Sequence, residues 1–298
     1  MPNRKNLMFD RSIRIWLASL CALLCFAEPA LRAGDDPKEI LRRALRVNAR
    51  NHELELAYTY IERDEQRTLD GAGAVKHRES TTWDVIPLRE DSQFRRLTQR
   101  DDKPLSPQEE RKQEAARQKR EAERRKTDAQ RANEAPEQRQ QRLDAKERSR
   151  QRERQQMDEV VDGLDLRLAG EEQIDGVPVW VIEAAPHPGY RFNSNDVARF
   201  LGKMKGRVWV SKGDYQPVRI DAETTDTISF GMVVARLGKG MHIHMEYAYV
   251  NNEVWLPKRM TFSVSGRIAL LKGFRMDGDS AFSNYKKFSV ESRIVSDH

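Results

Sequence analysis

Cysteine is almost absent from this chain of 298 residues, since Cys21 and Cys25 are its only two. Both lie near the start, so everything after residue 33 lacks a disulfide, a thiolate metal ligand and a cysteine nucleophile. Cysteine-based catalysis is thereby excluded. Without a disulfide, the folded part has to be stabilised by its hydrophobic core.

A long hydrophobic run is also missing. The most apolar stretch covers residues 15–27, which is shorter than the roughly 20 residues that a membrane-spanning helix needs. Basic residues precede this stretch and small residues ending at Ala33 follow it. This three-part pattern is typical of a cleaved secretory signal peptide. We therefore predict that residues 1–33 are removed, after Ala33 or after Ala27, and that a soluble exported protein remains.

Aromatic residues are missing from residues 101–158, and Leu105, Leu143 and Met157 are the only large apolar residues there. The same stretch holds 17 Lys and Arg against 14 Asp and Glu, a net charge of +3 (17 minus 14). A segment of this composition cannot bury a core of its own. Its alternation of both charge signs favours a solvated surface insertion over a polyanion-binding tract, because excess cation is what attracts phosphate.

The charged segment nevertheless has strong helix signals. Ser106, Pro107 and Glu109 form a capping-box pattern, and the following residues are mostly Ala, Glu, Gln, Arg and Lys. Pro136 interrupts this pattern. We predict two solvated, partly frayed helices, and a coiled coil is disfavoured because no apolar heptad is sustained.

Signatures of common hydrolases are absent as well. The chain has no G-x-S-x-G elbow, no H-E-x-x-H helix and no S-x-x-K motif. The scattered acids Asp84, Glu183 and Glu246 show no pairing in the sequence. We predict a protein that is not an enzyme and that uses no cofactor.

The rest of the chain predicts one helix followed by many strands. Asp36, Pro37 and Glu39 resemble a helix start, and an apolar stripe follows to Val47. From Leu54 onward the apolar period becomes two, and turns such as Asp175-Gly176 mark hairpins. A short helix is expected over 194–205. The pattern predicts an antiparallel α+β domain over 34–298, interrupted by the charged insertion 101–158.

Two of the expected strands are apolar on both faces, namely VPVWVIE (177–183) and GRVWVSK (206–212). A sheet with one solvated face should alternate apolar and polar residues. Apolar material must therefore cover both sides of these strands. A plain two-layer sandwich satisfies this condition, and so does a sheet with helices on one face and a cavity on the other.

The stretch from Met241 to Phe262 sharpens the choice. Alternation along a strand puts His242, His244 and Glu246 on one face. They are weak candidates for a metal site, because no second histidine motif supplies further ligands. The opposite face carries large apolar residues, and methionine suits a wall that accepts varied shapes. By strand parity we nominate a ligand-binding wall of Met241, Ile243, Met245, Tyr247, Tyr249, Leu256, Met260, Phe262, Trp180, Trp209, Phe230 and Met232.

Three motifs carry a resemblance to a known family. They are GEEQIDGVPV (170–179), GRVWVSK (206–212) and VWLPKR (254–259). Together with the leader and the first helix, they resemble exported bacterial proteins of the outer-membrane lipoprotein-sorting type, similar to the LolA and LolB carriers and the regulator RseB. The resemblance implies a strongly curved antiparallel sheet, an incomplete β-barrel covered by helices, whose apolar concave face holds acyl chains.

Two functions follow from this resemblance. The first is a periplasmic, non-catalytic protein that binds or carries a lipid or the acyl chain of a lipidated protein, with transient membrane contact. The second is an envelope stress regulator or adaptor that holds another envelope protein through residues 106–157. Nucleic acid is excluded as a partner because an exported protein rarely meets it.

Overall fold

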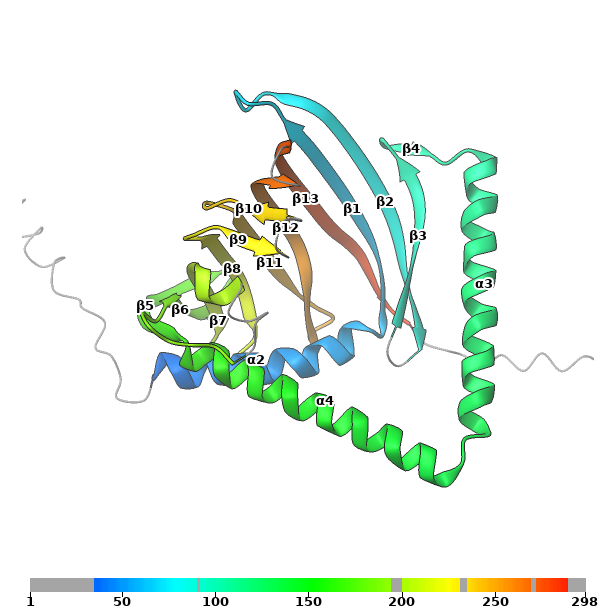
Figure 1. Ribbon diagram of the computed structural model, residues 1–298, viewed down its shortest axis with the longest axis horizontal. Helices are drawn as coiled ribbons and strands as arrows, with labels where there is room; N and C mark the ends of the chain where they lie inside the picture. Colours follow the sequence, from blue (N-terminus) through cyan, green and yellow to red (C-terminus); the bar gives the residue numbers. More distant parts are fainter. Residues whose placement is uncertain (1–34, 90–91, 194–199, 231–234, 269–271, 289–298) are drawn as a thin grey trace, which may run out of the picture. The chain divides into compact units, whose positions relative to one another are not determined.

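The computed structural model describes residues 35–89, 92–193, 200–230, 235–268 and 272–288 (Figure 1). The predicted signal peptide therefore lies outside the described residues. The elements in chain order are α2 (Pro37–Glu55), β1 (Tyr58–Leu69), β2 (Val75–Arg89), β3 (Ser92–Arg100), β4 (Lys103–Pro104), α3 (Pro107–Ala132), α4 (Pro136–Asp162), β5 (Leu164–Ile174), β6 (Val177–Pro186), the 3-10 turn η1 (Leu201–Lys203), β7 (Met204–Ser211), β8 (Pro217–Thr224), β9 (Ile228–Phe230), β10 (Ala235–Leu237), β11 (His242–Val250), β12 (Val254–Ile268) and β13 (Lys272–Lys287).

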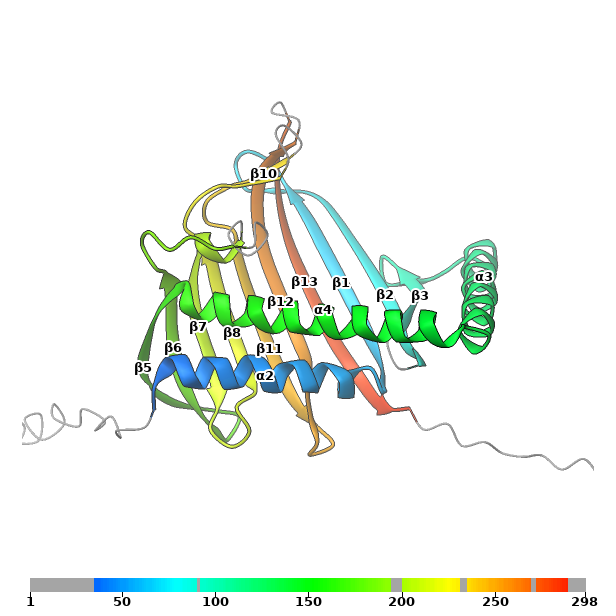
Figure 2. The same ribbon diagram turned by 60° about the horizontal axis from the view of Figure 1, so that its bottom comes forward.

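All paired strands are antiparallel and belong to one sheet. Its order is β4-β3-β2-β1-β13-β12-β11-β8-β7-β6-β5, so β4 and β5 are the two edges. The edges curve toward the side on which α2 and α4 lie and do not pair with each other (Figures 1 and 2). The predicted fold class, a curved antiparallel sheet short of a closed barrel with helices over it, is confirmed.

The hairpin turns explain much of this order. Asp175 and Gly176 both have positive φ, at 51° and 82°, which matches the twist that a two-residue hairpin requires. Asn251 and Asn252 also have positive φ, at 53° and 55°, in the three-residue turn 251–253 between β11 and β12. Asparagine and aspartate tolerate this conformation better than other residues with a side chain. These short links fix the register of the strands that they join.

Helix α2 begins at Pro37 as predicted, and it covers part of one face of the sheet. Its residues Ile40 and Ala44 are buried in a cluster with Trp180, Ile182 and Val210 of β6 and β7. We call the face that carries this cluster the inner face, and the opposite one the outer face. The helix continues through Glu55, so the strand expected from Leu54 starts only at Tyr58.

The charged segment is the covalent link between the two edges of the sheet. The chain leaves edge strand β4, forms α3 and then α4, and enters the opposite edge strand β5. The two edge strands are thus connected through these helices. At about 1.5 Å per residue, each of these helices is roughly 40 Å long, and together they reach from one edge to the other across the inner side (Figures 1 and 2). The sequence indicates an insertion, whereas the structure shows a crossover.

The predicted helix start at Ser106 is confirmed, and the predicted interruption falls at Pro136. The capping box at Ser106 and Glu109 is formed, and α4 begins at Pro136. Helix α3 has no buried residue, whereas the last turn of α4 buries Val161. There Asp162 pairs with Arg42 of α2 at 2.7 Å. The crossover is therefore anchored at its C-terminal end and solvated along most of its length.

Most of the short helix expected over 194–205 lies outside the described residues. Phe200 is helical, the turn η1 follows, and β7 begins at Met204, where it pairs with Thr224 of β8. One local prediction is corrected. The stretch TISFGMVVARL does not form one strand beside β11. Its described parts are β9 and β10, which pair with each other, and β10 pairs with β12. The other edge of β11 is occupied by β8 over His242 to Glu246.

Candidate functional site: the two faces of the sheet

The inner face of β11 and β12 carries a row of apolar side chains. Ile243 pairs with Phe262 and Met245 pairs with Met260, and residues paired directly across strands point to the same side. On the next strand Met245 pairs with Ile220, which extends the row toward the cluster under α2. All these side chains are half-buried.

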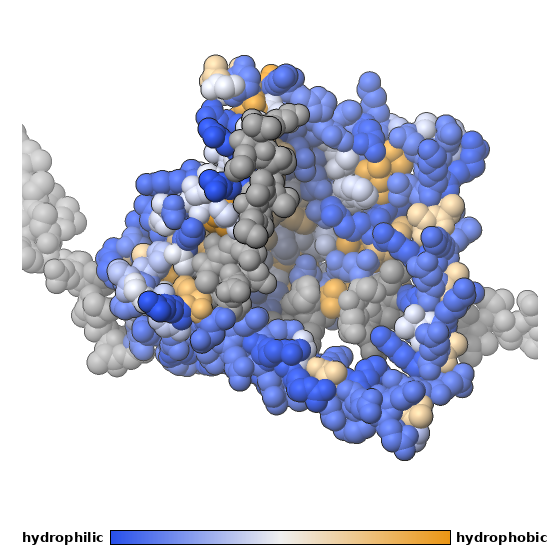
Figure 3. Space-filling view, viewed as in Figure 1, coloured by the Kyte–Doolittle hydropathy of each residue, from blue (hydrophilic) through white to orange (hydrophobic). Residues whose placement is uncertain are grey.

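The row is only half-buried although a helix covers its neighbours. Ile243, Met245, Met260 and Phe262 belong to none of the buried clusters of the described residues. The space-filling view shows a hollow between the sheet and helices α3 and α4, with hydrophobic residues in it and a hydrophilic surround (Figure 3). The sheet thus presents apolar surface on its inner side beyond the reach of α2.

A glycine on the neighbouring strand makes room for one side chain of this row. Gly278 of β13 pairs with Phe262, and a methyl group at position 278 would overlap the Phe262 ring. The ring therefore lies flat against the backbone of β13. Next along β11, the Tyr247 hydroxyl donates to the sulfur of Met245 at 2.8 Å. Burial, with a smaller contribution from the charge of Glu55, raises the pKa of Tyr247 to about 12.

The predicted wall does not form one surface. Trp180 lies on the inner face in the cluster under α2, whereas Trp209 pairs with Val181 on the outer face and donates to Glu172 at 2.9 Å. Leu256 is fully buried in the core with Tyr58 and Val254, so it offers no accessible surface. Tyr249 is exposed and packs against Trp255.

Three further nominated residues add nothing to the inner row. Met241 precedes β11, and its backbone N–H donates to the hydroxyl of Thr224 at 2.9 Å. The side chain of Phe230 and the whole of Met232 lie outside what the structure describes. The described inner row is therefore Ile243, Met245, Met260 and Phe262, and we keep the name inner row for these four residues. Tyr247 packs instead against the cluster that contains Val181 and Trp209.

The histidines lie on the outer face, opposite the inner row. Asp221 of β8 contacts both of them, His242 Nε2 and His244 Nδ1 each at 3.0 Å, and His244 Nε2 lies 3.3 Å from Glu246. Partial burial opposes ionisation of Asp221, but hydrogen bonds from the two histidines bring its pKa below the ordinary value. Within the described ranges, no group of three or more His, Cys, Asp or Glu residues could hold a metal ion.

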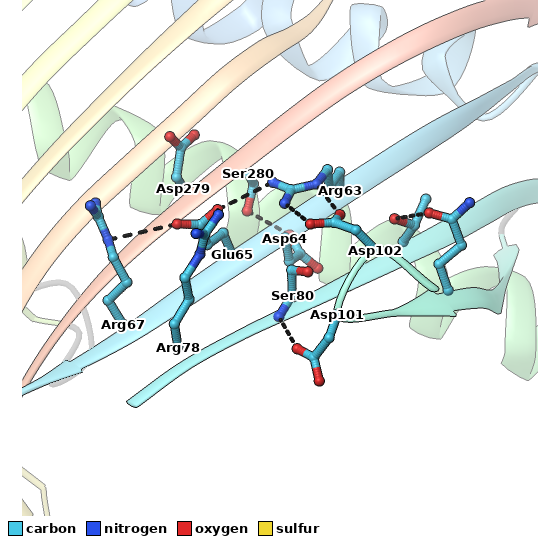
Figure 4. A network of polar contacts seen from close by, with 12 residues as sticks. Arg63, Asp64, Glu65, Arg67, Arg78, Ser80, Asp101, Asp102, Asp279 and Ser280 are labelled. Carbon is cyan, nitrogen blue, oxygen red and sulfur yellow. Dashed lines mark hydrogen bonds and ion pairs between the residues drawn. The ribbon is translucent and has the colours of Figure 1, made fainter. Parts of the chain in front are cut away.

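Most of the outer face of β1, β2, β12 and β13 is a lattice of ion pairs. Arg63 binds Asp102 through two bonds of 2.8 Å, and Glu65 contacts Arg78 at 2.7 Å (Figure 4). Arg259 forms a two-bond pair with Asp279, at 3.0 and 2.6 Å.

The scattered acids noted in the sequence are paired on this outer face too. Asp84 contacts Arg96, Glu183 lies between Arg167 and Arg207, and Glu246 lies 3.6 Å from Arg219. Hydrogen bonds from Arg167 and Arg207 hold the pKa of Glu183 below its ordinary value.

A buried acidic pair on the inner face of β1 was not found from the sequence. Glu62 is only 13% exposed and contacts Arg95 at 2.8 Å, and the same guanidinium lies 3.1 Å from Asp64. Burial, followed by the negative charge of Asp64, raises the pKa of Glu62 to about 7. Asp64 also accepts a 2.6 Å hydrogen bond from Ser280. The polar string YIERDEQRT gives no sign that alternate residues are buried.

The inner face therefore has an apolar part and an acidic part. The apolar part comprises the inner row on β11 and β12, and the acidic part lies two strands away on β1, beyond β13. Tyr60 and Tyr285 lie near the acidic part with ring centroids 5.2 Å apart, and burial raises the pKa of both well above the ordinary value. An amphipathic ligand would meet both parts on one surface.

Among comparisons with known proteins, only the comparison with solved structures finds proteins similar to this chain. No family model matches the chain, and no curated protein matches it. A putative outer membrane lipoprotein-sorting protein domain from Vibrio parahaemolyticus is 10% identical, with 83% of this chain and 92% of that one covered and a TM-score of 0.31. A LolA superfamily protein from Nitrosomonas europaea is 12% identical, with 88% and 97% covered and a TM-score of 0.27.

The complex of MucA and MucB from Pseudomonas aeruginosa also contains a similar chain, at 9% identity, 83% and 94% coverage and a TM-score of 0.23. Solved structures similar to this chain thus include two of lipoprotein-sorting and LolA type. TM-scores below 0.5 carry nothing about function, which has to come from this chain's own residues. No helix among the described residues has the length and apolar character to cross a membrane.

Proposed function

We propose that this chain is a non-catalytic periplasmic protein that binds a lipid, or the acyl chain of a lipidated protein, against the inner row. The observation that carries the proposal is the row itself. Four large apolar side chains share one face and stay half-buried, while the opposite face of the same strands is polar. Each methylene group removed from water contributes about 0.8 kcal/mol, so acyl-chain length should dominate the affinity.

The arrangement of the inner face supports an amphipathic ligand. A chain lying on β11 and β12 has the acidic part of β1 within the same hollow, where Glu62 can donate a hydrogen bond when protonated and accept one when ionised. The crossover helices α3 and α4 border this hollow (Figure 3). Their charged surfaces keep the rim hydrated, so apolar contact is confined to the sheet.

Neighbouring residues on β12 provide a matched test. Met260 belongs to the inner row, and Thr261 beside it points to the outer face toward Asp279; both are half-buried. Met260→Lys should abolish uptake of a fluorescent fatty acid and remove lipid from the native mass spectrum of protein purified from cells. Thr261→Lys should leave both unchanged. Wild-type protein that repeatedly carries no lipid and takes up no fatty acid would refute the proposal.

The adaptor function is the second candidate, and the exposure of α3 favours it. No residue of α3 is buried, and its charged side chains pair mainly within the helix, as Arg117 does with Glu114 and Glu121. Because 106–157 joins the two sheet edges, its deletion would also disrupt the sheet. Replacing exposed α3 residues with Gln and Ala is the cleaner experiment. An adaptor would lose a co-purifying envelope protein, whereas a carrier would keep its lipid.

A further inference from the structure

Three arginines gather at one end of the sheet, on β10, β12 and β13. Arg236 pairs directly with Arg267, and Ser265 pairs with Arg275 while Arg267 pairs with Gly273. Pairing and alternation place all three arginines on the outer face, with Arg267 and Arg275 as diagonal neighbours. Like charges directly opposite each other on adjacent strands are destabilising. Repulsion between these like charges therefore destabilises this end of the sheet, whereas arginines elsewhere on the outer face are paired with carboxylates.

Arginines elsewhere on the outer face have carboxylate partners, whereas these three have none within the described ranges. Arg63, Arg259 and Arg207 each contact a carboxylate. Among the described residues, no ion pair or hydrogen bond is formed by the side chains of Arg236, Arg267 or Arg275, all of which are exposed. Within the part of the chain that the structure describes, the donors of these three guanidinium groups are therefore available to a ligand.

These arginines line a cavity rather than a flat surface. It has a volume of about 650 Å³, and Phe274 and Leu69 contribute apolar lining. Small-molecule sites commonly have volumes of this order. Glycines leave room in it: a side chain at Gly71 would have nothing within 4 Å, and one at Gly273 would only approach the Gly266 carbonyl, at 3.9 Å.

The charge of the cavity is strongly positive. Asp70 is the one acid among its described lining residues, and its carboxylate already accepts hydrogen bonds from the backbone N–H groups of Ala72 and Ala74, both at 2.9 Å. The guanidinium of Arg275 reaches the same turn, 3.7 Å from where a side chain at Gly73 would lie. The lining therefore has three arginines and one aspartate, whose carboxylate is already hydrogen-bonded to the backbone, and this leaves an excess of two positive charges.

We propose that this cavity binds a phosphate-bearing anion of the size of a lipid headgroup or a small phosphate ester. Guanidinium groups bind phosphate through paired, charge-assisted hydrogen bonds, which makes converging arginines suited to this ligand. The apolar lining fits the glycerol portion that a phospholipid headgroup carries. The residues that line this cavity include none of the inner row, so the site does not rest on acyl-chain binding there.

The experiment compares two triple variants. Arg236→Gln, Arg267→Gln and Arg275→Gln remove the cluster, and Arg154→Gln, Arg167→Gln and Arg207→Gln remove the same charge elsewhere. Binding is measured by sedimentation with phosphatidylcholine vesicles with and without phosphatidylglycerol, and by ³¹P NMR titration with glycerol phosphate. Near an anionic surface each basic residue contributes about 1 kcal/mol, which corresponds to a loss of about fivefold in affinity per arginine removed.

The expected result is binding to phosphatidylglycerol vesicles that only the cluster variant loses, with Met260→Lys retaining it. Binding of glycerol phosphate with the same dependence on the cluster, but no vesicle binding, identifies a soluble phosphate ester as the ligand and also supports the site. Equal losses in the two triple variants would show a response to net charge alone and overturn the proposal. The absence of binding to every phosphate probe would overturn it as well.

Discussion

The two faces of β11 and β12 carry side chains of opposite character, apolar on one side and polar on the other. Within a few residues of the same strand, Met245 lies half-buried on apolar neighbours while His244 and Glu246 form polar contacts on the other side. Alternation of side chains lets one strand serve both surfaces. Opposite solvent environments therefore act on residues that are adjacent in sequence, and substitutions at neighbouring positions should have very different effects.

The largest expected effect is on the inner face beneath α2. Trp180 is 6% exposed and packs against Tyr215 and the α2 residues Ile40 and Ala44. Trp180→Ala should lower the free energy of unfolding by about 3–5 kcal/mol, because a large cavity remains in the core. Urea denaturation measures this loss. Arg167→Ala, on the outer face of neighbouring β5, should change it by less than about 1 kcal/mol; equal losses would contradict the two-face interpretation.

The acidic part of the inner face should give the next largest effect, and it depends on pH. The unfolded chain ionises Glu62 at the ordinary carboxyl pKa, whereas the folded chain does so only near pH 7. Between these values the unfolded state binds fewer protons, so stability falls as pH rises through this window and then levels off.

Glu62→Gln removes this pH-dependent loss of stability. At about pH 8 the variant should be more stable than the parent by up to about 3 kcal/mol, and at about pH 4 the difference should vanish. Urea denaturation over this pH range measures it. An equal difference at both pH values would show that Glu62 has an ordinary pKa and is not desolvated.

The smallest effect is expected for an outer ion pair. Arg259 and Asp279 form two hydrogen bonds, but the Arg259 side chain is 55% exposed. Arg259→Ala should cost less than about 1 kcal/mol, because exposed pairs are screened and lose side-chain entropy when they form. Added salt should reduce the cost further, and thermal unfolding at two salt concentrations measures it. A loss above about 2 kcal/mol would place this pair in the core.

The strand pattern was predictable because short-range physics determines it. A few adjacent residues are enough to specify each local feature. Examples are the hairpin turn at Asp175-Gly176, the helix starts at Pro37 and Ser106, and the alternation in 241–262. The predictions that failed concern features set by contacts between segments that are distant in the sequence. Trp180 and Trp209 have similar apolar surroundings in the sequence, yet pairing of β6 with β7 sends them to opposite faces. Likewise TISFGMVVARL has strand character along its length, but β8 already occupies the edge of β11.

The acidic pair and the arginine cluster escaped detection for the same reason. Glu62 lies in a string of polar residues, and its burial beside Asp64 and Arg95 exists only in the assembled sheet. Arg236, Arg267 and Arg275 come from three strands and meet only through cross-strand register.

The sequence by itself determined the local elements of this protein: two faces for each strand, capped helices, and a charged segment unable to form a core. These properties follow from backbone preferences and from side-chain period, which need no distant partner. Only the tertiary structure decided which face is inner, that 106–157 bridges the two sheet edges, and which charges lack a partner. Those features depend on contacts between residues far apart in the chain, whose register is fixed when the whole sheet assembles.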